Sequence, residues 1–316
     1  MEDQEKTLAP LRFTPVPRQF DWGTQRYLLA DLGDPDTKVS RGELEDNSLG
    51  ELMETYLERL SGENAYYYYG RQFPVCVSEI SVETRTPLFV CPDDATAGPR
   101  YDALGKAKLW YVVDADEKAR MAIGLRAGVT AEELYAGCTT GMIYDRLQWF
   151  SPRPGTAWLV PPSAVHCIEG HIRVIEIAEA SLIDLVLCDW KSVEPDGLSE
   201  ALDFVDMSAC DAPEPVQALQ RPEFMVNVLH LAAPQEISQD DGASFVVYVC
   251  VKGSVSVQIR SAAGTDGSET VVLAGETVLV PAEVPSFVLT PRLPGTVVIE
   301  ATLGSLPVPD SYINTD

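Results

Sequence analysis

Basic residues are scarce in this chain. Its 316 residues include 23 lysines and arginines against 48 aspartates and glutamates, so the formal net charge is −25. A surface this negative repels nucleic-acid phosphates and anionic membranes, so we expect neither as a partner. An anionic sugar phosphate could bind only in a pocket that concentrates positive charge. The charge balance thus excludes two classes of partner and identifies none.

Three further features are missing. No run approaches the roughly 18 apolar residues that a membrane helix needs, and residues 1–6 lack the basic and apolar regions of a secretory signal. The seven cysteines are scattered and contain no Cys-x-x-Cys pair. An odd, scattered set suits reduced thiols better than a disulfide framework. We therefore expect a cytoplasmic protein.

Short apolar and β-branched runs, punctuated by Gly and Pro, fill most of the chain. Many short strands at close spacing predict a sandwich or a closed barrel. A Gly-containing turn followed by a strand that ends at Pro occurs twice, in residues 154–162 and 273–282. This repeat predicts two barrels similar to the cupin fold, with the acidic residues 211–215 as a linker. No His follows Pro281, so we expect no metal centre in the second barrel.

Helical periodicity is clearest from Asn47 to Leu60, and shorter helices are predicted at residues 130–135 and 199–205. The tetrad Tyr66 to Tyr69 fits a strand with two rings inward and two outward. We expect an all-β fold in the main, with two cupin-like jelly-roll barrels and a few helices packed on the first. The predicted domains are residues 1–79, an extended segment and helix on barrel one; residues 80–210, barrel one with its pocket; and residues 222–316, barrel two.

Three segments carry a resemblance to a known family. Residues 89–94 read Phe-Val-Cys-Pro-Asp-Asp, residues 105–110 read Gly-Lys-Ala-Lys-Leu-Trp, and residues 162–166 read Pro-Ser-Ala-Val-His. In frame they resemble the Gln-x-His-Pro-Asp-Asp, Gly-Lys-Thr-Glu-x-Trp and Ala-Gly-x-x-His motifs of type I phosphomannose isomerases. That resemblance implies two cupin barrels and a zinc-dependent interconversion of mannose 6-phosphate and fructose 6-phosphate. It runs from about residue 22 to residue 205 and is weaker in the second barrel.

The resemblance also shows what has been lost. The four zinc-ligand positions of the family, Gln, His, Glu and His, fall on Phe89, Cys91, Lys108 and His166. Phenylalanine cannot bind a metal, whereas Cys91 could do so as a thiolate. Only His166 is unchanged, and a lone histidine that faces a barrel interior is more often a hydrogen-bonded core residue than a metal ligand. We expect no cofactor, with zinc as the alternative if Cys91 and His166 bind it together with Glu176 or Asp93.

Other family positions give candidate substrate contacts. Lys106 matches the lysine beside the metal, so it is a candidate for substrate binding and catalysis, although a solvated lysine at a strand edge would look the same. Trp22 matches a tryptophan at the mouth of the pocket. Ser181 is what remains of an Asn-Ser-Asp run, and Val186 stands where the family has its catalytic arginine. Asp93 and Asp94 more simply retain a turn.

The exchange of glutamate for Lys108 leads to a specific hypothesis. It removes one negative charge and adds one positive charge, a swing of two units that equals the lost dication. Because unpaired buried carboxylates are costly, we predict that the Lys108 ammonium points into barrel one near His166 and Cys91. There it could hold an acidic neighbour or an anionic ligand. The alternative is that Lys108 extends to solvent.

These residues support three functional hypotheses. The first is an isomerase-like protein without catalytic activity that binds a sugar or a sugar phosphate. The second is an active aldose–ketose isomerase with a rebuilt metal site, and the third is a structural or regulatory interaction protein. We expect no nucleic-acid or membrane partner. The sequence does not indicate an oligomeric state.

Overall fold

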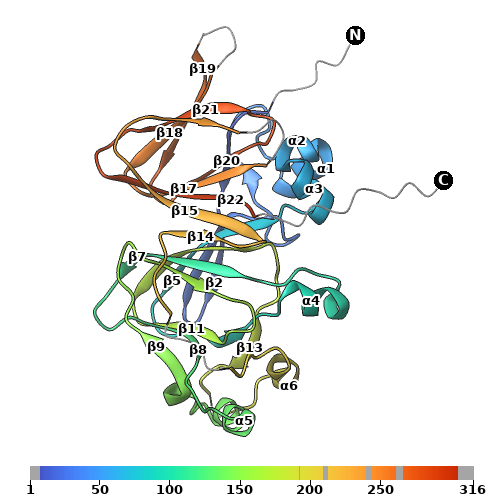
Figure 1. Cartoon of the computed structure of the whole chain (residues 1–316), viewed down its shortest axis with the longest axis vertical. Helices are drawn as coiled ribbons and strands as arrows, with labels where there is room; N and C mark the ends of the chain where they lie inside the picture. The colour runs from blue at the N-terminus through green and yellow to red at the C-terminus, as the bar shows by residue number, and fades with distance from the viewer. Residues whose placement is uncertain (1–7, 192, 209–212, 240–243, 261–265, 305–316) are drawn as a thin grey trace, which may run out of the picture. The chain divides into compact units, whose positions relative to one another are not determined.

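The computed structural model describes residues 8–191, 193–208, 213–239, 244–260 and 266–304 (Figure 1). The expected linker lies partly outside these ranges, at residues 211 and 212, as does Cys210. The chain divides into two compact units. Barrel one contains residues 13–51 and 75–217, and barrel two contains residues up to 12, residues 52–74 and those from 218 onward. No helix among the described residues is long and apolar enough to cross a membrane.

Barrel one is built from two antiparallel sheets. The six-stranded sheet has the order β10 (Ala157–Val160), β7 (Lys108–Ala115), β12 (Ile172–Glu179), β5 (Val75–Val82), β3 (Gly23–Leu29) and β2 (Val16–Phe20). The five-stranded sheet has the order β13 (Leu185–Cys188), β6 (Leu88–Val90), β11 (His166–Glu169), β8 (Arg120–Leu125) and β9 (Leu147–Phe150). Apolar residues from both sheets, such as Val112 and Met121, pack into one core.

The helices of barrel one are α4 (Asp94–Tyr101), α5 (Ala131–Thr140) and α6 (Leu198–Leu202), with a 3₁₀ turn at Tyr144–Arg146. Helix α5 begins at a capping box, in which Thr130 and Glu133 each accept a backbone N–H of the other. Helix α4 begins where the Asp93 side chain accepts the N–H of Thr96. The short strand β4 (Lys38–Val39) pairs with Phe13 and Thr14.

Barrel two repeats the two-sheet plan. One sheet runs β14 (Ala218–Gln220), β15 (Phe224–Leu231), β22 (Thr296–Leu303), β17 (Val246–Lys252), β20 (Thr277–Val280) and β1 (Leu11–Thr14), whose first two residues pair with β20. The other runs β16 (Gln235–Ser238), β21 (Ser286–Pro291), β18 (Ser254–Arg260) and β19 (Asp266–Leu273). Valine and aromatic side chains from both sheets, including Tyr248 and Phe287, form its core. The predicted β-rich, double-barrel fold class is confirmed.

The structure corrects the expected domain boundaries. Strands β2, β3 and β5 belong to the six-stranded sheet of barrel one, so that barrel begins at about residue 13 rather than 80. Residues 52–74, expected on barrel one, group with barrel two instead. The backbone N–H groups of Ala282 and Glu283 donate to the carbonyls of Leu60 and Arg59, both at 3.0 Å. Such long-range contacts leave no trace in a local periodicity.

Two local predictions in the same region are also corrected. The helix expected up to Leu60 is interrupted, so that α1 (Leu49–Tyr56) and α2 (Glu58–Ser61) flank Leu57, whose φ of 48° is incompatible with a right-handed helix. The tyrosine tetrad is helical, within α3 (Glu63–Tyr69), and not a strand. Tyr66 and Tyr69 are half-buried, a spacing of three that fits one helix face.

Candidate functional site

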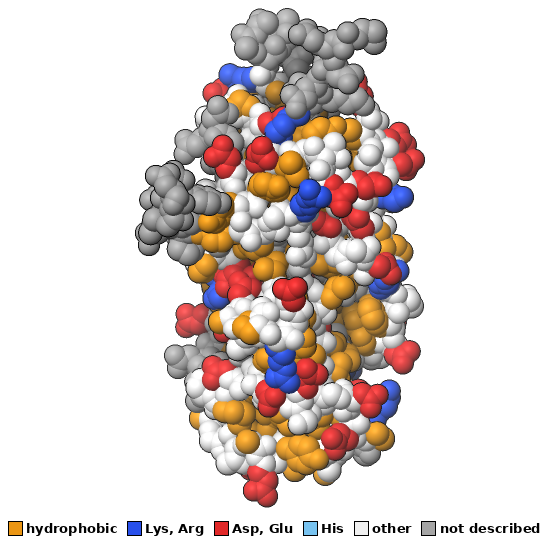
Figure 2. All heavy atoms as spheres, turned by 90° about the vertical axis from the view of Figure 1, so that its right-hand side faces the viewer, with side chains coloured by type: hydrophobic (Ala, Val, Ile, Leu, Met, Phe, Trp, Pro, Cys, Tyr) orange, Lys and Arg blue, Asp and Glu red, His pale blue; other side chains and the backbone are white. Residues whose placement is uncertain are grey.

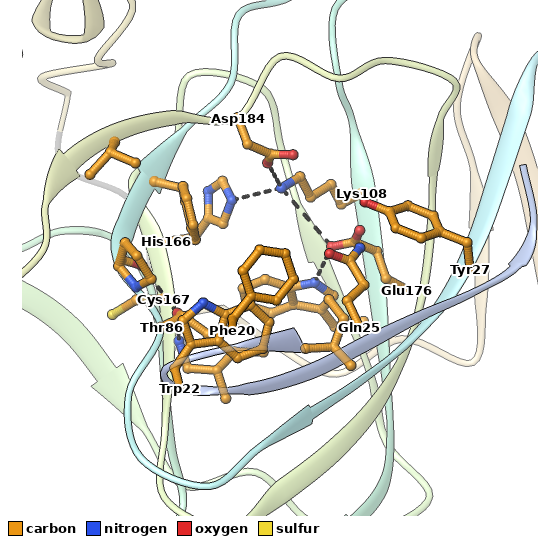
Figure 3. Close-up of a pocket in the computed structure, with 16 residues that line it drawn as sticks. Phe20, Trp22, Gln25, Tyr27, Thr86, Lys108, His166, Cys167, Glu176 and Asp184 are labelled. Atoms are coloured by element: carbon orange, nitrogen blue, oxygen red, sulfur yellow. Dashed lines mark hydrogen bonds and ion pairs between the residues drawn. The ribbon is translucent and has the colours of Figure 1, made fainter. Parts of the chain in front are cut away.

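Barrel one contains a partly open cavity of about 360 Å³ (Figure 3). Aromatic side chains line much of it, from the β2–β3 hairpin (Phe20, Trp22 and Tyr27), from β6 (Phe89) and from β7 (Trp110). The rings of Phe20 and Trp22 stack with centroids 4.7 Å apart. Two carboxylates, one ammonium and one imidazole also reach the cavity, from β7 (Lys108), β11 (His166), β12 (Glu176) and the residue before β13 (Asp184).

Strand register explains why these groups meet. Residues directly opposite each other on antiparallel strands share a face of the sheet. His166 lies opposite Phe89, and Glu176 lies opposite Trp110. Lys108 is two residues from Trp110 and therefore shares its face. The alternation of the strands thus directs Lys108, His166 and Glu176 toward one interior.

Lys108 points into barrel one and not to solvent. Its side chain is 4% exposed, and its Nζ lies 3.0 Å from His166 Nε2. The same ammonium donates a hydrogen bond to Asp184 Oδ1 and lies 4.0 Å from Glu176 Oε2 (Figure 3). The prediction of a built-in cation near His166 and Cys91 is therefore confirmed, and the acidic neighbour that it holds is Asp184.

His166 accepts this hydrogen bond as a neutral imidazole. Its Nδ1 lies 2.9 Å from the carbonyl oxygen of Ala164, which can only accept, so the ring proton belongs on Nδ1. Nε2 then presents its lone pair to the Lys108 ammonium. Burial, followed by the positive charge of Lys108, lowers the pKa of His166 to about 3. The residue is 1% exposed, so little water reaches the ring.

Asp184 joins two lysines. Its Oδ1 accepts from Lys108, and its Oδ2 accepts from Lys106. Burial alone would raise the pKa of this carboxyl, but the two ammonium groups hold it well below its ordinary value. Burial alone would likewise lower the pKa of each lysine, and attraction to Asp184 raises both above the ordinary value. The cluster is a charged, hydrogen-bonded network at the wall of the cavity.

Cys91 belongs to the same cluster as a neutral thiol. Its Sγ donates to Asp184 Oδ1 at 3.2 Å. Burial and the negative charge of Asp184 raise the pKa of the thiol. Cys91, His166 and Asp184 each place one potential metal-ligand atom within 4.8 Å of the others. They are the one such group of three found among the described residues.

Of the other residues predicted from the sequence, one lines the cavity and two do not. Trp22 lines the cavity, as predicted. Lys106 is buried but does not line the cavity, because it faces Asp184, so a direct substrate contact has no support here. Ser181 also lies outside the cavity lining; its hydroxyl donates to the Leu104 carbonyl at 2.9 Å and accepts from the Ile183 N–H. Its role as a substrate contact stays a prediction that the cavity lining does not support.

The two retained aspartates have structural roles, as expected. Asp93 caps α4, and Asp94 accepts the N–H of Gly105 at 2.7 Å. Gly105 is required at that close approach, since a Cβ there would lie 2.4 Å from the Asp93 backbone. Asp93 is exposed and engaged in its cap, so it is not the third metal ligand considered from the sequence. The group next to Cys91 and His166 is Asp184.

Sequence reasoning missed Asp184 altogether. A signal was available: Lys106 and Lys108 are two residues apart, so both ammonium groups point to one side and need a common counter-charge. Asp184 precedes Val186 by two residues and would therefore share its face once β13 is placed. What the sequence did not give is the pairing of β13 with β6, which brings Val186 opposite Phe89.

The buried neutral His166 predicts acid sensitivity. The folded chain protonates it only near pH 3, whereas the unfolded chain does so near the ordinary pKa of 6.5. The contribution of the neutral His166 to the free energy of unfolding is therefore fully present above about pH 6.5. It decreases as the pH is lowered, and at pH 5 the loss from this group alone is about 2 kcal/mol. Urea denaturation of the wild type and of His166→Gln at about pH 7 and pH 5 measures it. The variant is expected to lose less stability on acidification.

A matched control is His171→Gln, because His171 is exposed. This variant is expected to keep the acid sensitivity of the wild type. Equal pH dependence in the wild type and in His166→Gln would contradict the assignment of a buried neutral imidazole.

The chain is similar in sequence to proteins named as mannose-6-phosphate isomerases. The chain is 23% identical over 319 residues to the Bacillus subtilis protein named "Putative mannose-6-phosphate isomerase YvyI", covering 90% of this chain and 96% of that protein. It is 26% identical over 210 residues to mannose-6-phosphate isomerase ManA of the same bacterium, covering 60% and 64%. No protein-family model matches the chain.

Among solved structures, the mannose 6-phosphate isomerase of Bacillus subtilis superimposes with a TM-score of 0.78 at 20% identity. The superposition covers 93% of this chain and 99% of that enzyme. A structure from Archaeoglobus fulgidus, described as that of "a putative mannosephosphate isomerase", gives a TM-score of 0.74 at 17% identity and covers 93% of this chain and 97% of that chain. The likeness to these structures shows the fold over nearly the whole chain.

Proposed function

We propose that this chain, a relative of the phosphomannose isomerases, binds a sugar or a sugar phosphate in barrel one without isomerising it. One observation carries the proposal: the ammonium of Lys108 lies at hydrogen-bond distance from His166 Nε2, the atom that would have to bind a metal. The nitrogen lone pair can serve an N–H donor or a metal ion, but not both. Lys108 thus takes the place of the cation instead of leaving a gap.

The remaining donors do not fit zinc while Lys108 is in place. Asp184 is committed to two ammonium groups, and Cys91 is a protonated thiol whose pKa is raised by burial and by Asp184. A catalytic zinc needs about three deprotonated or neutral ligands and an open position. An ammonium about 4 Å from a dication would oppose binding by several kcal/mol at an intermediate dielectric. The cluster therefore does not fit a catalytic zinc ion.

The pocket also lacks the other catalytic groups of the related enzymes. Val186 lies in the cavity wall where that family has its arginine, and an alkyl group can neither donate nor accept a proton. Lys106, the retained family lysine, is held by Asp184 at the wall. An isomerisation needs stabilised oxyanion charge and a mobile proton between two carbons. Trp22, Phe20 and Trp110 instead provide surfaces that a ring can contact.

The decisive test is fructose 6-phosphate formation from mannose 6-phosphate with zinc, cobalt or manganese added. We expect no detectable turnover, because several groups needed for the reaction are missing together. Mannose-6-phosphate isomerase ManA of Bacillus subtilis serves as the positive control. A turnover on the order of 1 per second or more, within the ordinary enzyme range, would establish the alternative of an active isomerase.

That alternative has one observation in its favour, the proximity of Cys91, His166 and Asp184. It requires Lys108 to leave His166 when a metal arrives. An interaction protein without a small ligand is the other alternative, and it predicts no melting shift with any sugar. We also propose a cytoplasmic location, since the six cysteines among the described residues are unpaired.

A further inference from the structure

The charge of the cavity decides which kind of ligand it favours. Among the described lining residues the one cation is Lys108, and it faces two carboxylates, Glu176 and Asp184. Lys106 behind the wall adds a second positive charge, so the cluster as a whole is neutral. No arginine belongs to the described lining. A phosphate dianion would therefore enter a pocket that has no surplus of positive charge.

The long-range field points the same way. The chain carries a net charge of −25. Figure 2 shows acidic side chains spread over one face of the molecule among apolar ones, with fewer basic side chains between them. Such a field lowers the local concentration of anions and slows their association. An uncharged ligand does not pay this penalty.

The free polar atoms of the cavity suit hydroxyl groups. Lys108 has three N–H donors, and two are used by His166 and Asp184, because the 4.0 Å to Glu176 is too long for a hydrogen bond. Glu176 Oε2 accepts from Trp110 Nε1 at 2.8 Å, which leaves its Oε1 to a ligand. A carboxylate only accepts, so it binds a hydroxyl and repels a phosphate.

Two further polar groups add to this set. The hydroxyl of Tyr27 has no hydrogen-bond partner among the described residues and is directed inward in Figure 3. Gln25 donates to Ser78 Oγ at 3.1 Å, so its side-chain oxygen can accept from a ligand. The cavity therefore offers both donors and acceptors to a ligand. Only a compound whose groups both donate and accept can use them together.

The aromatic walls fit a compact ring. Phe20 and Trp22 stack at the cavity, and Phe89 and Trp110 line it further. Pockets that combine apolar rings with a few convergent polar groups bind ligands that have both kinds of surface. A volume of about 360 Å³ is sufficient for a monosaccharide-sized molecule.

We infer that barrel one selects an uncharged polyhydroxylated ring, a sugar without a phosphate group, over the corresponding sugar phosphate. Lys108 and Glu176 hold its hydroxyl groups, and the Phe20–Trp22 pair covers its apolar face. This inference rests on the proposed function, ligand binding without turnover, and specifies the class of ligand.

The test is isothermal titration of the full chain with D-mannose and D-fructose, with their 6-phosphates, and with inorganic phosphate. We expect the free sugars to bind at least tenfold more tightly than the 6-phosphates. The diagnostic variant is Glu176→Gln, which keeps the shape and removes one negative charge. It is expected to weaken the free sugars about threefold or more and to strengthen the 6-phosphates. If Glu176 had only a structural role, the variant would change the affinity for the free sugars and the affinity for the 6-phosphates in the same direction.

The matched control is Glu79→Gln. Glu79 is a buried carboxylate on β5 that pairs with Arg26 at 2.9 Å and does not line the cavity. The Glu79→Gln variant should leave the preference for free sugars over their 6-phosphates unchanged. Tighter binding of a 6-phosphate than of its free sugar in the wild type would overturn the inference and leave binding without turnover intact. Absence of binding by every probe up to about 10 mM would refute both, and isomerase turnover would refute the proposed function alone.

Discussion

Replacement of Lys108 by glutamate is expected to create a zinc site, whereas we expect no zinc binding by the wild type. The change removes the ammonium from His166 Nε2 and restores the residue type of the related family at that position. Together with Cys91, His166 and Asp184 it supplies enough donors for one ion. Titration of zinc against a competing chelator should show one equivalent bound by Lys108→Glu and none by the wild type.

Thermal stability gives an independent readout of the same change. Without metal, Lys108→Glu places a third carboxylate beside Glu176 and Asp184, so its melting temperature should fall below that of the wild type. Zinc at about 100 times its dissociation constant should then stabilise the variant by about 2.7 kcal/mol. Addition of zinc should leave the wild type unchanged.

Two companion variants make this result interpretable. Lys108→Glu combined with His166→Ala should lose the zinc, because one essential ligand is gone. Lys108→Gln removes the ammonium without adding a ligand and should bind zinc more weakly than Lys108→Glu. Stoichiometric zinc binding by the wild type, with an affinity equal to that of Lys108→Glu, would show that Lys108 does not exclude the metal.

Replacement of Asp184 by asparagine is expected to lower the free energy of unfolding by about 3 kcal/mol. It leaves two buried ammonium groups, on Lys106 and Lys108, without their common counter-charge, and the loss of one partner of a buried ion pair costs about 3–5 kcal/mol. The lower end of this range applies because the Asp184 side chain is 30% exposed to solvent. Urea denaturation at neutral pH measures the change, as a lower midpoint at constant slope.

The control for this prediction is Asp189→Asn. Asp189 has a similar exposure of 32%, but its partner Lys191 is 72% exposed, and the two lie 3.3 Å apart. Exposed pairs contribute about 1 kcal/mol or less. Adding Lys106→Met to Asp184→Asn should recover part of the lost stability, because one unpaired charge is removed. Equal losses in Asp184→Asn and Asp189→Asn would contradict the buried-network assignment.

The sequence by itself determined the family resemblance and the broad fold. The three motifs are local, each within six residues, and the turn-strand-Pro repeat is local as well. Local spacing also showed the change of sign at Lys108. Charge balance favoured an inward ammonium but left a solvent-directed one open, and the structure decided between them. Predictions of this kind depend only on residue type and on the alternation of side chains along a strand, and both can be read from a short segment.

The tertiary structure decided which groups meet. Asp184 lies 76 residues from Lys108 in the chain, and only the pairing of β13 with β6 brings it to the ammonium. The same holds for residues 52–74, whose position depends on hydrogen bonds to Ala282 and Glu283, more than 200 residues away. Local periodicity carries no information about such partners, because the energy that selects them arises only when distant segments pack.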